Sequence, residues 1–337
     1  MFLYVKSPFI NYEIEFNRKV TIIQGDSGTG KSKILEAIKR LRKMKSASIY
    51  TTNGHKVVML KDYMDWEGEI NNSKNIVFLI DEDCEFIKSN SFARSVHNSL
   101  NYFIIISRDP INGLNYSYDE IYELKTSGKY NKTVRKYNLE NFSDLSEDCQ
   151  IVLVEDSGSG YEFYRYHLPM EVFSIEGKSK MAEAVRRQLS KNNVSKIGII
   201  VDGAAFGSEM GNIKALEEVH KDVNFDWFLP ESTEGFIVKN EVLNFRSFTD
   251  KISDKDEIYY SSAETMYYKL LRENTVGTPA LYSKEFINSC YTENCCHKKC
   301  SGCKFYTRLN KKEFVNTIVF KRDIREGDVE NDKLLFE

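Results

Sequence analysis

The chain has 337 residues, of which 41% are hydrophobic and 29% are charged, a balance typical of a folded protein with about two domains. Its 47 Lys and Arg against 50 Asp and Glu give a net charge of −3, which excludes an overall basic field for nucleic acid but not a local basic patch. The apolar runs are far shorter than the ~20 residues that cross a bilayer, and the first residues lack a signal-peptide pattern, so we expect a cytoplasmic protein with no membrane partner.

The N-terminal region starts with short strands predicted at 2–6 and 12–16, followed by a buried β-branched strand at 20–24. The next residues fit the P-loop pattern G-x-x-x-x-G-K-[ST] at every position: Gly25, Asp26, Ser27, Gly28, Thr29, Gly30, Lys31 and Ser32. Glycines let backbone N–H groups surround phosphate oxygens, and the helix predicted from Ser32 to about Lys43 points its positive end at them. Lys31 would reach the β- and γ-phosphates and Ser32 would bind Mg²⁺. We therefore expect a bound nucleoside triphosphate, ATP or GTP.

A second acidic motif follows the apolar strand predicted at 76–80. Asp81 would hold Mg²⁺ through water, and Glu82 stands where hydrolytic P-loop proteins keep the residue that orients the attacking water. A third apolar strand is predicted at 102–107. It ends at Ser107 and Arg108, which either lie near the γ-phosphate or belong to an ordinary surface loop.

Residues 1–135 resemble the ABC-type ATPases of the SMC and OLD (overcoming-lysogenization-defect) group, above all in FNRKVTIIQGDSGTGKSKILEAI and FLIDED. The resemblance implies a P-loop NTPase domain with a central, mostly parallel sheet, which binds ATP and hydrolyses it with the help of Glu82. No LSGGQ-like signature precedes Asp81, and Arg108 stands where this group has its switch histidine.

The C-terminal half alternates strands with helices, which predicts a second, smaller α/β domain with a parallel sheet. Strands are predicted at 151–154, at 197–201 and from Val223 onward, and they are followed by Glu155, Asp202 and Glu234. Because the carboxyl ends of parallel strands meet at one edge, these carboxylates are expected to converge on Mg²⁺. The alternative is a domain whose acids only cap turns and helix N-termini.

Residues 150–245 resemble the Toprim domain of topoisomerases, primases and OLD nucleases. Glu155 matches the first acidic motif, Asp202 the second, and Glu234 resembles a later acid of OLD proteins. The resemblance implies that these residues are catalytic and bind metal for phosphodiester chemistry on nucleic acid, including DNA. The usual D-x-D reads Asp202-Gly203-Ala204 here, so Asp156 or Glu209 would have to supply a further ligand.

Five of the seven cysteines lie within a short segment: Cys290, Cys295, Cys296, Cys300 and Cys303. In a reducing compartment such a cluster favours a metal over disulfides. Cys300-x-x-Cys303 with a second pair suits a structural zinc ion, and an iron–sulfur cluster or reduced surface thiols are the alternatives. Basic and aromatic residues around the cluster would also suit a nucleic-acid backbone.

We predict three regions: a P-loop NTPase domain at 1–147, a Toprim-like α/β domain at 148–250, and a helical, Cys-rich zinc-binding region at 251–337. The first functional hypothesis is an ATP-hydrolysing P-loop protein whose Toprim-like half acts on nucleic acid. The second is an ATP switch whose inactive C-terminal half recognises a protein partner. A homo-oligomer fits either hypothesis.

Overall fold

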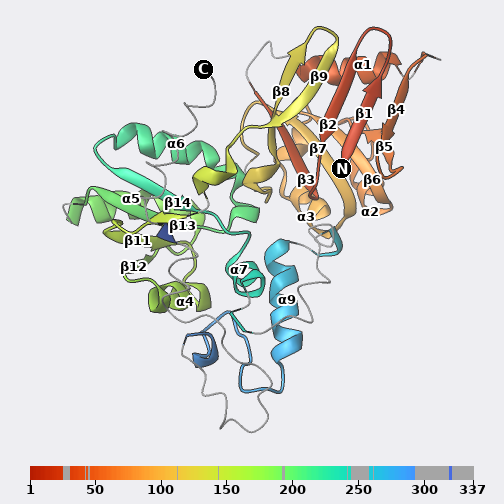
Figure 1. Cartoon of the computed structure of the whole chain (residues 1–337). Helices are drawn as coiled ribbons and strands as arrows, with labels where there is room; N and C mark the ends of the chain where they lie inside the picture. Colours follow the sequence, from red (N-terminus) through yellow and green to blue (C-terminus); the bar gives the residue numbers. More distant parts are fainter. Residues whose placement is uncertain are drawn as a thin grey trace, which may run out of the picture. The chain divides into compact units, whose positions relative to one another are not determined.

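The computed structural model describes residues 1–25, 31–41, 43–44, 46–111, 113–142, 144–191, 194–240, 242–243, 258–260, 262–292 and 319–320 (Figure 1). The chain is a mixed α/β protein with a nine-stranded, mostly parallel sheet and a four-stranded parallel sheet. This confirms the predicted α/β class. None of the helices in the described ranges combines the length and the apolar character that a membrane crossing needs.

The chain divides into two compact units. Unit 1 comprises Met1–Asn138, Gly203–Gly211 and Asp250–Met266, and unit 2 comprises Leu139–Asp202, Asn212–Thr249 and Tyr267–Glu337.

The large sheet of unit 1 has the strand order β4-β1-β2-β9-β8-β3-β7-β6-β5. Its strands are β1 (Phe2–Lys6), β2 (Asn11–Glu15), β3 (Val20–Gln24), β4 (Ser48–Thr51), β5 (Lys56–Met59), β6 (Lys74–Asp81), β7 (Leu100–Ser107), β8 (Ile121–Ser127) and β9 (Tyr130–Arg135). Strands β8, β3, β7, β6 and β5 run parallel to their neighbours in this series. The pairs β1–β2, β1–β4 and β8–β9 are antiparallel.

The parallel part of this sheet has a hydrophobic cluster on each face. Side chains alternate along each strand, so neighbouring residues of one strand contribute to different clusters. On β7, Ile104 and Ile106 belong to the core cluster that includes Ile38 of α1 (Lys31–Leu41). Phe103 points to the opposite face, where its ring packs 5.5 Å from Phe78. Three further rings extend this second cluster from α2 (Trp66–Asn71), η1 (Glu85–Lys88) and α3 (Asn90–Asn98): Trp66, Phe86 and Phe92.

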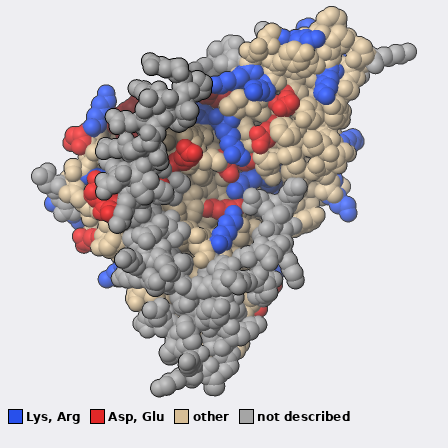
Figure 2. All heavy atoms as spheres, viewed as in Figure 1, with Lys and Arg blue, Asp and Glu red and all other residues tan. Residues whose placement is uncertain are grey.

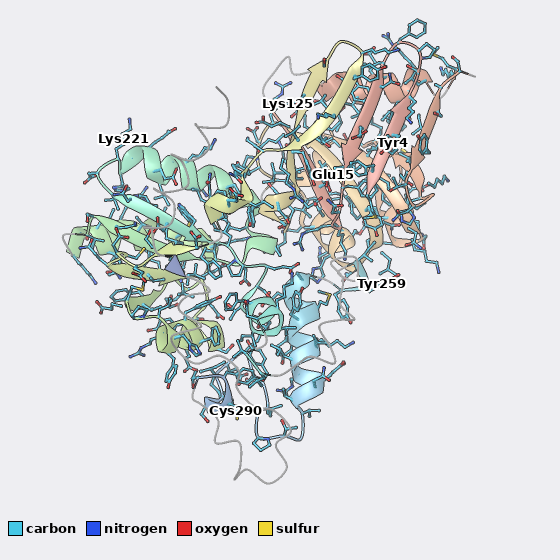
Figure 3. The ribbon with its side chains drawn as sticks, viewed as in Figure 1. Tyr4, Glu15, Lys125, Lys221, Tyr259 and Cys290 are labelled. Carbon is cyan, nitrogen blue, oxygen red and sulfur yellow. The ribbon has the colours of Figure 1, made fainter. Side chains whose placement is uncertain are left out.

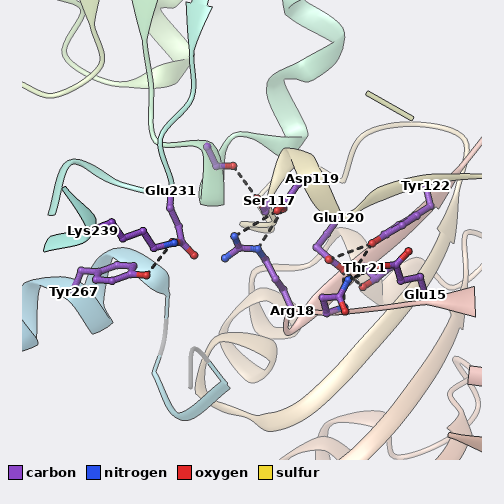
Figure 4. Close-up of polar contacts among 12 residues, drawn as sticks. Glu15, Arg18, Thr21, Ser117, Asp119, Glu120, Tyr122, Glu231, Lys239 and Tyr267 are labelled. Carbon is purple, nitrogen blue, oxygen red and sulfur yellow. Dashed lines mark hydrogen bonds and ion pairs between the residues drawn. The ribbon is translucent and has the colours of Figure 1, made fainter. Parts of the chain in front are cut away.

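A carboxyl group is buried beside β3. Glu120 ends the short 3-10 helix η2 (Tyr118–Glu120) and is only 1% exposed. It accepts hydrogen bonds from the Thr21 hydroxyl (2.6 Å) and the Asn17 N–H (3.1 Å), as Figure 4 shows for Thr21. Burial raises the pKa of Glu120 to about 7. The Tyr122 hydroxyl donates a third hydrogen bond, to Oε1 at 3.4 Å. These donors offset part of the cost of burying a carboxyl group.

The small sheet of unit 2 has the order β12-β11-β13-β14, with all pairs parallel. Its strands are β11 (Ile151–Val154), β12 (Glu171–Ser174), β13 (Lys196–Ile200) and β14 (Asn224–Phe228), and a separate parallel pair joins β10 (Leu145–Ser146) to β15 (Val319–Phe320). The remaining helices include α4 (Ser159–His167), α5 (Met181–Lys191), α6 (Met210–Val219), α7 (Thr233–Lys239), α9 (Ala263–Thr275) and the 3-10 helix η8 (Ser289–Tyr291).

Candidate functional site

The P-loop sequence lies between β3 and α1, as its pattern requires. Strand β3 ends at Gln24, and α1 begins at Lys31. Residues Asp26, Ser27, Gly28, Thr29 and Gly30 lie outside the described residues, as do the side chains of Lys31 and Ser32. The first turn of α1 contains no acidic residue, so no carboxylate there opposes an anion at the helix N-terminus.

Strand β7 lies between β3, which leads into the loop, and β6, which carries the acidic motif. Gln24 pairs with Ser107, and Asp81 pairs with Ile106, the residue before it. All three strands are parallel, so their carboxyl ends form one edge. This edge therefore brings Gly25, Asp81 and Arg108 together from distant parts of the sequence. Open α/β sheets place ligands at such an edge.

The Asp81 carboxylate already faces a positive charge. Its Oδ2 lies 3.6 Å from the Lys61 Nζ, and both side chains are largely shielded from solvent, at 15% and 18% exposed. Lys61 follows β5, the neighbour of β6 in the sheet, and no sequence motif marks it. A carboxylate at a strand end is a suitable Mg²⁺ ligand, and Lys61 offsets its charge while no metal is bound.

Glu82 is held by Arg108 through both of its carboxylate oxygens. The Arg108 Nε lies 2.7 Å from Oε1, and the Arg108 backbone N–H donates to Oε2 at 2.7 Å. Ser107 instead donates its hydroxyl to the Asp109 carbonyl, at 2.6 Å. The residue at the end of β7 thus contacts the acidic motif of β6 directly, a pairing that the sequence did not predict.

A chain of hydrogen bonds links these strand ends further. The Gln24 side-chain amide donates to the Arg108 carbonyl at 3.1 Å, and Lys136 donates to the Gln24 Oε1 at 2.9 Å. The residue just before the glycine-rich segment is therefore linked to the residue that binds Glu82. Gln24 could have been found from its position beside Gly25, whereas Lys136 is distant in sequence and carries no signal.

In unit 2, Glu155 and Asp202 lie next to each other at the carboxyl ends of β11 and β13. The Glu155 Oε2 accepts the backbone N–H of Asp202 at 3.1 Å. The strands bring them together because Val154 pairs with Ile200 in the parallel ladder. The predicted neighbours are thus joined through a carboxylate–backbone bond.

Glu234 is buried at the start of α7, only 4% exposed. The Tyr282 hydroxyl donates to its Oε1 at 3.1 Å and lies 3.1 Å from the Ser159 hydroxyl. Burial, together with the nearby Glu234 charge, raises the pKa of Tyr282 well above its ordinary value. Glu234 therefore connects α7 to the segment around Tyr282, a partner 48 residues later in the chain.

The acidic residues of unit 2 share one electrostatic neighbourhood around Tyr164. Burial raises the pKa of this tyrosine, and the nearby charges of Asp202, Glu234 and Asp156 raise it further. Asp156 itself accepts the N–H groups of two glycines at the start of α4, at 2.9 and 3.0 Å.

Among the residues that the structure describes, no group of three or more His, Cys, Asp or Glu is arranged to hold a metal ion. Glu155 accepts a backbone N–H and Glu234 accepts a tyrosine hydroxyl. The three-carboxylate Mg²⁺ site therefore stays a prediction.

One of the five clustered cysteines falls in the described part of the chain. Cys290 is buried in η8, and its Sγ lies 3.8 Å from the Pro279 carbonyl. The other four predicted zinc ligands lie outside the described residues: Cys295, Cys296, Cys300 and Cys303. The zinc prediction therefore stays a prediction.

Comparisons with models of known protein families, with curated proteins and with solved structures found no match to this chain. The functional argument therefore depends on the residues and their geometry.

Proposed function

We propose that unit 1 is a P-loop NTPase that binds a nucleoside triphosphate, which we expect to be ATP, at the carboxyl edge of β3, β7 and β6. The observation that carries this proposal is the position of β7 between the other two strands. It brings the end of β3, which leads into the glycine-rich loop, and the acidic end of β6 to one edge, next to the start of α1. A P-loop site needs these two parts to face the same phosphates.

Each residue in the proposed site has a separate task. Backbone N–H groups between Gly25 and Gly30 would surround the phosphates, and the Lys31 ammonium would neutralise the β- and γ-phosphates. Ser32 and Asp81 would hold Mg²⁺, which supplies charge neutralisation between those phosphates. Lys61 keeps the Asp81 carboxylate paired at 3.6 Å.

Glu82 is proposed to orient the water that attacks the γ-phosphate. Each of its oxygens takes one contact from Arg108, and an ionised carboxylate can accept about four hydrogen bonds, so Glu82 can still accept from water while Arg108 stays bound. Release of the Arg108 side chain from Oε1 would let the guanidinium approach the phosphate, where a cation stabilises the charge of the transition state.

Phosphate release from Mg·ATP and Mg·GTP tests the proposal. Glu82→Gln should bind nucleotide normally but hydrolyse it at least about 100-fold more slowly, the usual effect of losing a positioned general base. The matched control is Glu85→Gln, an exposed glutamate in η1, which should hydrolyse at the wild-type rate. Equal rates for Glu82→Gln and wild type would remove Glu82 from the mechanism.

For unit 2 two functions compete. One is metal-dependent phosphodiester chemistry on nucleic acid by Glu155, Asp202 and Glu234. The other is a switch in which unit 2 binds a protein partner without catalysis. The engagement of Glu155 by a backbone N–H and of Glu234 by Tyr282 favours the second.

A plasmid-nicking assay with Mg²⁺ or Mn²⁺, with and without ATP, separates the two functions. The switch predicts no nicking by wild type under any of these conditions. Nicking that disappears in Glu155→Ala would instead support the nuclease.

A further inference from the structure

The antiparallel part of the large sheet has an outward face of unusual composition. Along β1, Leu3 and Val5 are fully buried and belong to the core that includes α1, whereas the alternate residues Tyr4 and Lys6 point the other way. The same alternation holds on β8, where Leu124 is buried and Lys125 is exposed. The face opposite the core is therefore built from every second residue of these strands.

The strand register aligns these residues into a row across five strands. Tyr50 of β4 pairs with Tyr4 of β1, which pairs with Glu13 of β2. Glu13 pairs with Lys132 of β9, which in turn pairs with Lys125 of β8. Neighbouring strands are ~4.8 Å apart, so the row is about 19 Å long. It presents rings at one end and ammonium groups at the other, and Figure 3 labels Tyr4 and Lys125 near its two ends.

A groove of about 850 Å³ follows this row. Its lining includes four lysines, Lys6, Lys125, Lys129 and Lys132, and one acidic residue, Glu13, which leaves a local charge of +3. The whole chain has a net charge of −3, so the positive charge of the groove comes from lysines that are clustered there and does not reflect the overall composition. Figure 2 shows blue lysine and arginine atoms over unit 1, with some red acidic atoms between them. A positive groove of this kind attracts polyanions.

The rings in the groove are exposed and lie beside cations. Tyr50 is 40% exposed and Tyr130 is 62% exposed. The Tyr4 and Tyr50 rings lie 5.3 Å apart, and the Lys6 Nζ lies 5.0 Å and 5.5 Å from their centres. In the β8–β9 turn, the Lys129 Nζ lies 5.5 Å from the Tyr130 ring. Each exposed ring thus has an ammonium group beside it, which can reach the phosphate of a nucleotide whose base stacks on that ring.

We propose that this groove on β4, β1, β2, β9 and β8 binds single-stranded nucleic acid, with bases stacked on Tyr50 and Tyr130 and phosphates held by Lys125 and Lys132. Stacking rings beside a positively charged groove is the combination that single-strand binding uses, because every base has a π-face. At the ~3.4 Å rise of a stacked strand, the row spans about five to six nucleotides. This proposal is independent of the nucleotide site at β3 and α1.

The rings favour nucleic acid over other polyanions. An acidic peptide would use the lysines but would leave two exposed tyrosines without a role. The lysines would also be attracted to an anionic membrane surface, but lipid headgroups offer no planar groups to stack on the tyrosine rings. Both are arms of the test below.

The test is fluorescence anisotropy with a labelled oligothymidylate of about 20 nucleotides, longer than the ~4–16 nucleotides covered by a typical single-strand-binding module. Tyr50→Ala and Tyr130→Ala should each weaken binding about 5- to 150-fold. The matched control is Tyr63→Ala, which removes a ring that is 85% exposed outside the groove and should bind as wild type does. Circular dichroism of every variant verifies that the fold is retained.

The salt dependence tests the lysines separately. The Lys125→Gln/Lys132→Gln double variant should reduce the slope of log K against log salt by about 1.4, since each phosphate contact on a single strand contributes ~0.7. Lys74→Gln, at the exposed start of β6, should leave the slope unchanged. Lys31→Ala should also bind the oligonucleotide normally, which separates failure of this proposal from failure of the NTPase proposal.

Three results would overturn the inference. One is the absence of oligothymidylate binding by wild type at low salt. Another is binding that the tyrosine and lysine variants leave unchanged. The third is a preference for polyglutamate or for vesicles with phosphatidylserine over the oligonucleotide.

Discussion

Replacement of Glu120 by glutamine should stabilise unit 1 at neutral pH and stabilise it much less in mild acid. The carboxyl is only 1% exposed, and burial raises its pKa to about 7 from an ordinary value of 4.5. Glutamine keeps an oxygen that can accept the hydrogen bonds of Thr21 and Asn17, but it carries no charge at any pH. The substitution therefore isolates the cost of the buried charge.

The direction in which the stability changes with pH follows from proton binding by Glu120. Between pH 4.5 and about 7 the folded state holds the Glu120 proton more tightly than the unfolded state. The stability of the wild type therefore falls as the pH rises through this window, and it stays lower above it. A pKa difference of about 2.5 units corresponds to about 3 kcal/mol, at ~1.4 kcal/mol per unit. Glu120→Gln should avoid this loss.

Urea unfolding at pH 5 and pH 8 measures the effect. The chain has two tryptophans, Trp66 in unit 1 and Trp227 in unit 2, so a Trp227→Phe background leaves a fluorophore that reports on unit 1. Trp66 packs 4.8 Å from the Phe86 ring and should change its emission on unfolding. In this background, the free energy of unfolding of Glu120→Gln should be higher than that of the Trp227→Phe parent by about 3 kcal/mol at pH 8 and by much less at pH 5.

The control is Glu85→Gln, which changes an exposed glutamate of the same unit and should shift stability by less than ~0.5 kcal/mol at either pH. The reasoning would be refuted if the gain from Glu120→Gln were the same at both pH values, because a constant gain would not come from the charge.

Three further predictions concern other parts of the chain. Arg108→Ala should lower the free energy of unfolding by less than ~1 kcal/mol, because the Arg108 side chain is 55% exposed. A large loss of nucleotide hydrolysis in the same variant would therefore indicate a catalytic role for Arg108. Gly158→Ala should destabilise unit 2 by about 1–3 kcal/mol in thermal unfolding, since the new Cβ would lie 2.2 Å from the Lys284 carbonyl oxygen. In Gly211→Ala the new Cβ would meet no atom within 4 Å, so this variant should be neutral or slightly stabilising. Metal analysis should find about one zinc per chain, lost in Cys300→Ser/Cys303→Ser, and a folded, metal-free wild type would end the zinc prediction.

The strands of this fold could be predicted where their residues are continuously apolar. The runs in β3, β6, β7, β11 and β13 are buried on both faces. Such a continuous apolar run can be predicted as a strand from its own residues, with no knowledge of the strand that it pairs with. Strands β4, β5 and β12 were missed because each has only four residues and is partly exposed, so that pairing with a neighbour stabilises it more than its own composition does.

The candidate site divides in the same way. The acidic residues at strand ends could be predicted because each follows its own apolar run. The pairing of Glu82 with Arg108 could not, because it depends on β7 lying next to β6 in the sheet. Glu234 was placed correctly after a strand, but its binding to Tyr282 depends on a contact between segments that are far apart in sequence, and this contact changes its role. The Lys and Tyr row likewise depends on the register of five strands.

The central claim is that the loop between β3 and α1 binds a nucleoside triphosphate with Mg²⁺. Isothermal titration calorimetry of the full chain with Mg²⁺ and a slowly hydrolysed ATP analogue tests it most directly, with Lys31→Ala as the variant and Lys74→Gln as the matched control. The account predicts about one site per chain, retained in Lys74→Gln and lost in Lys31→Ala. Equal affinity of the wild type and Lys31→Ala, or no binding by the wild type, would contradict it.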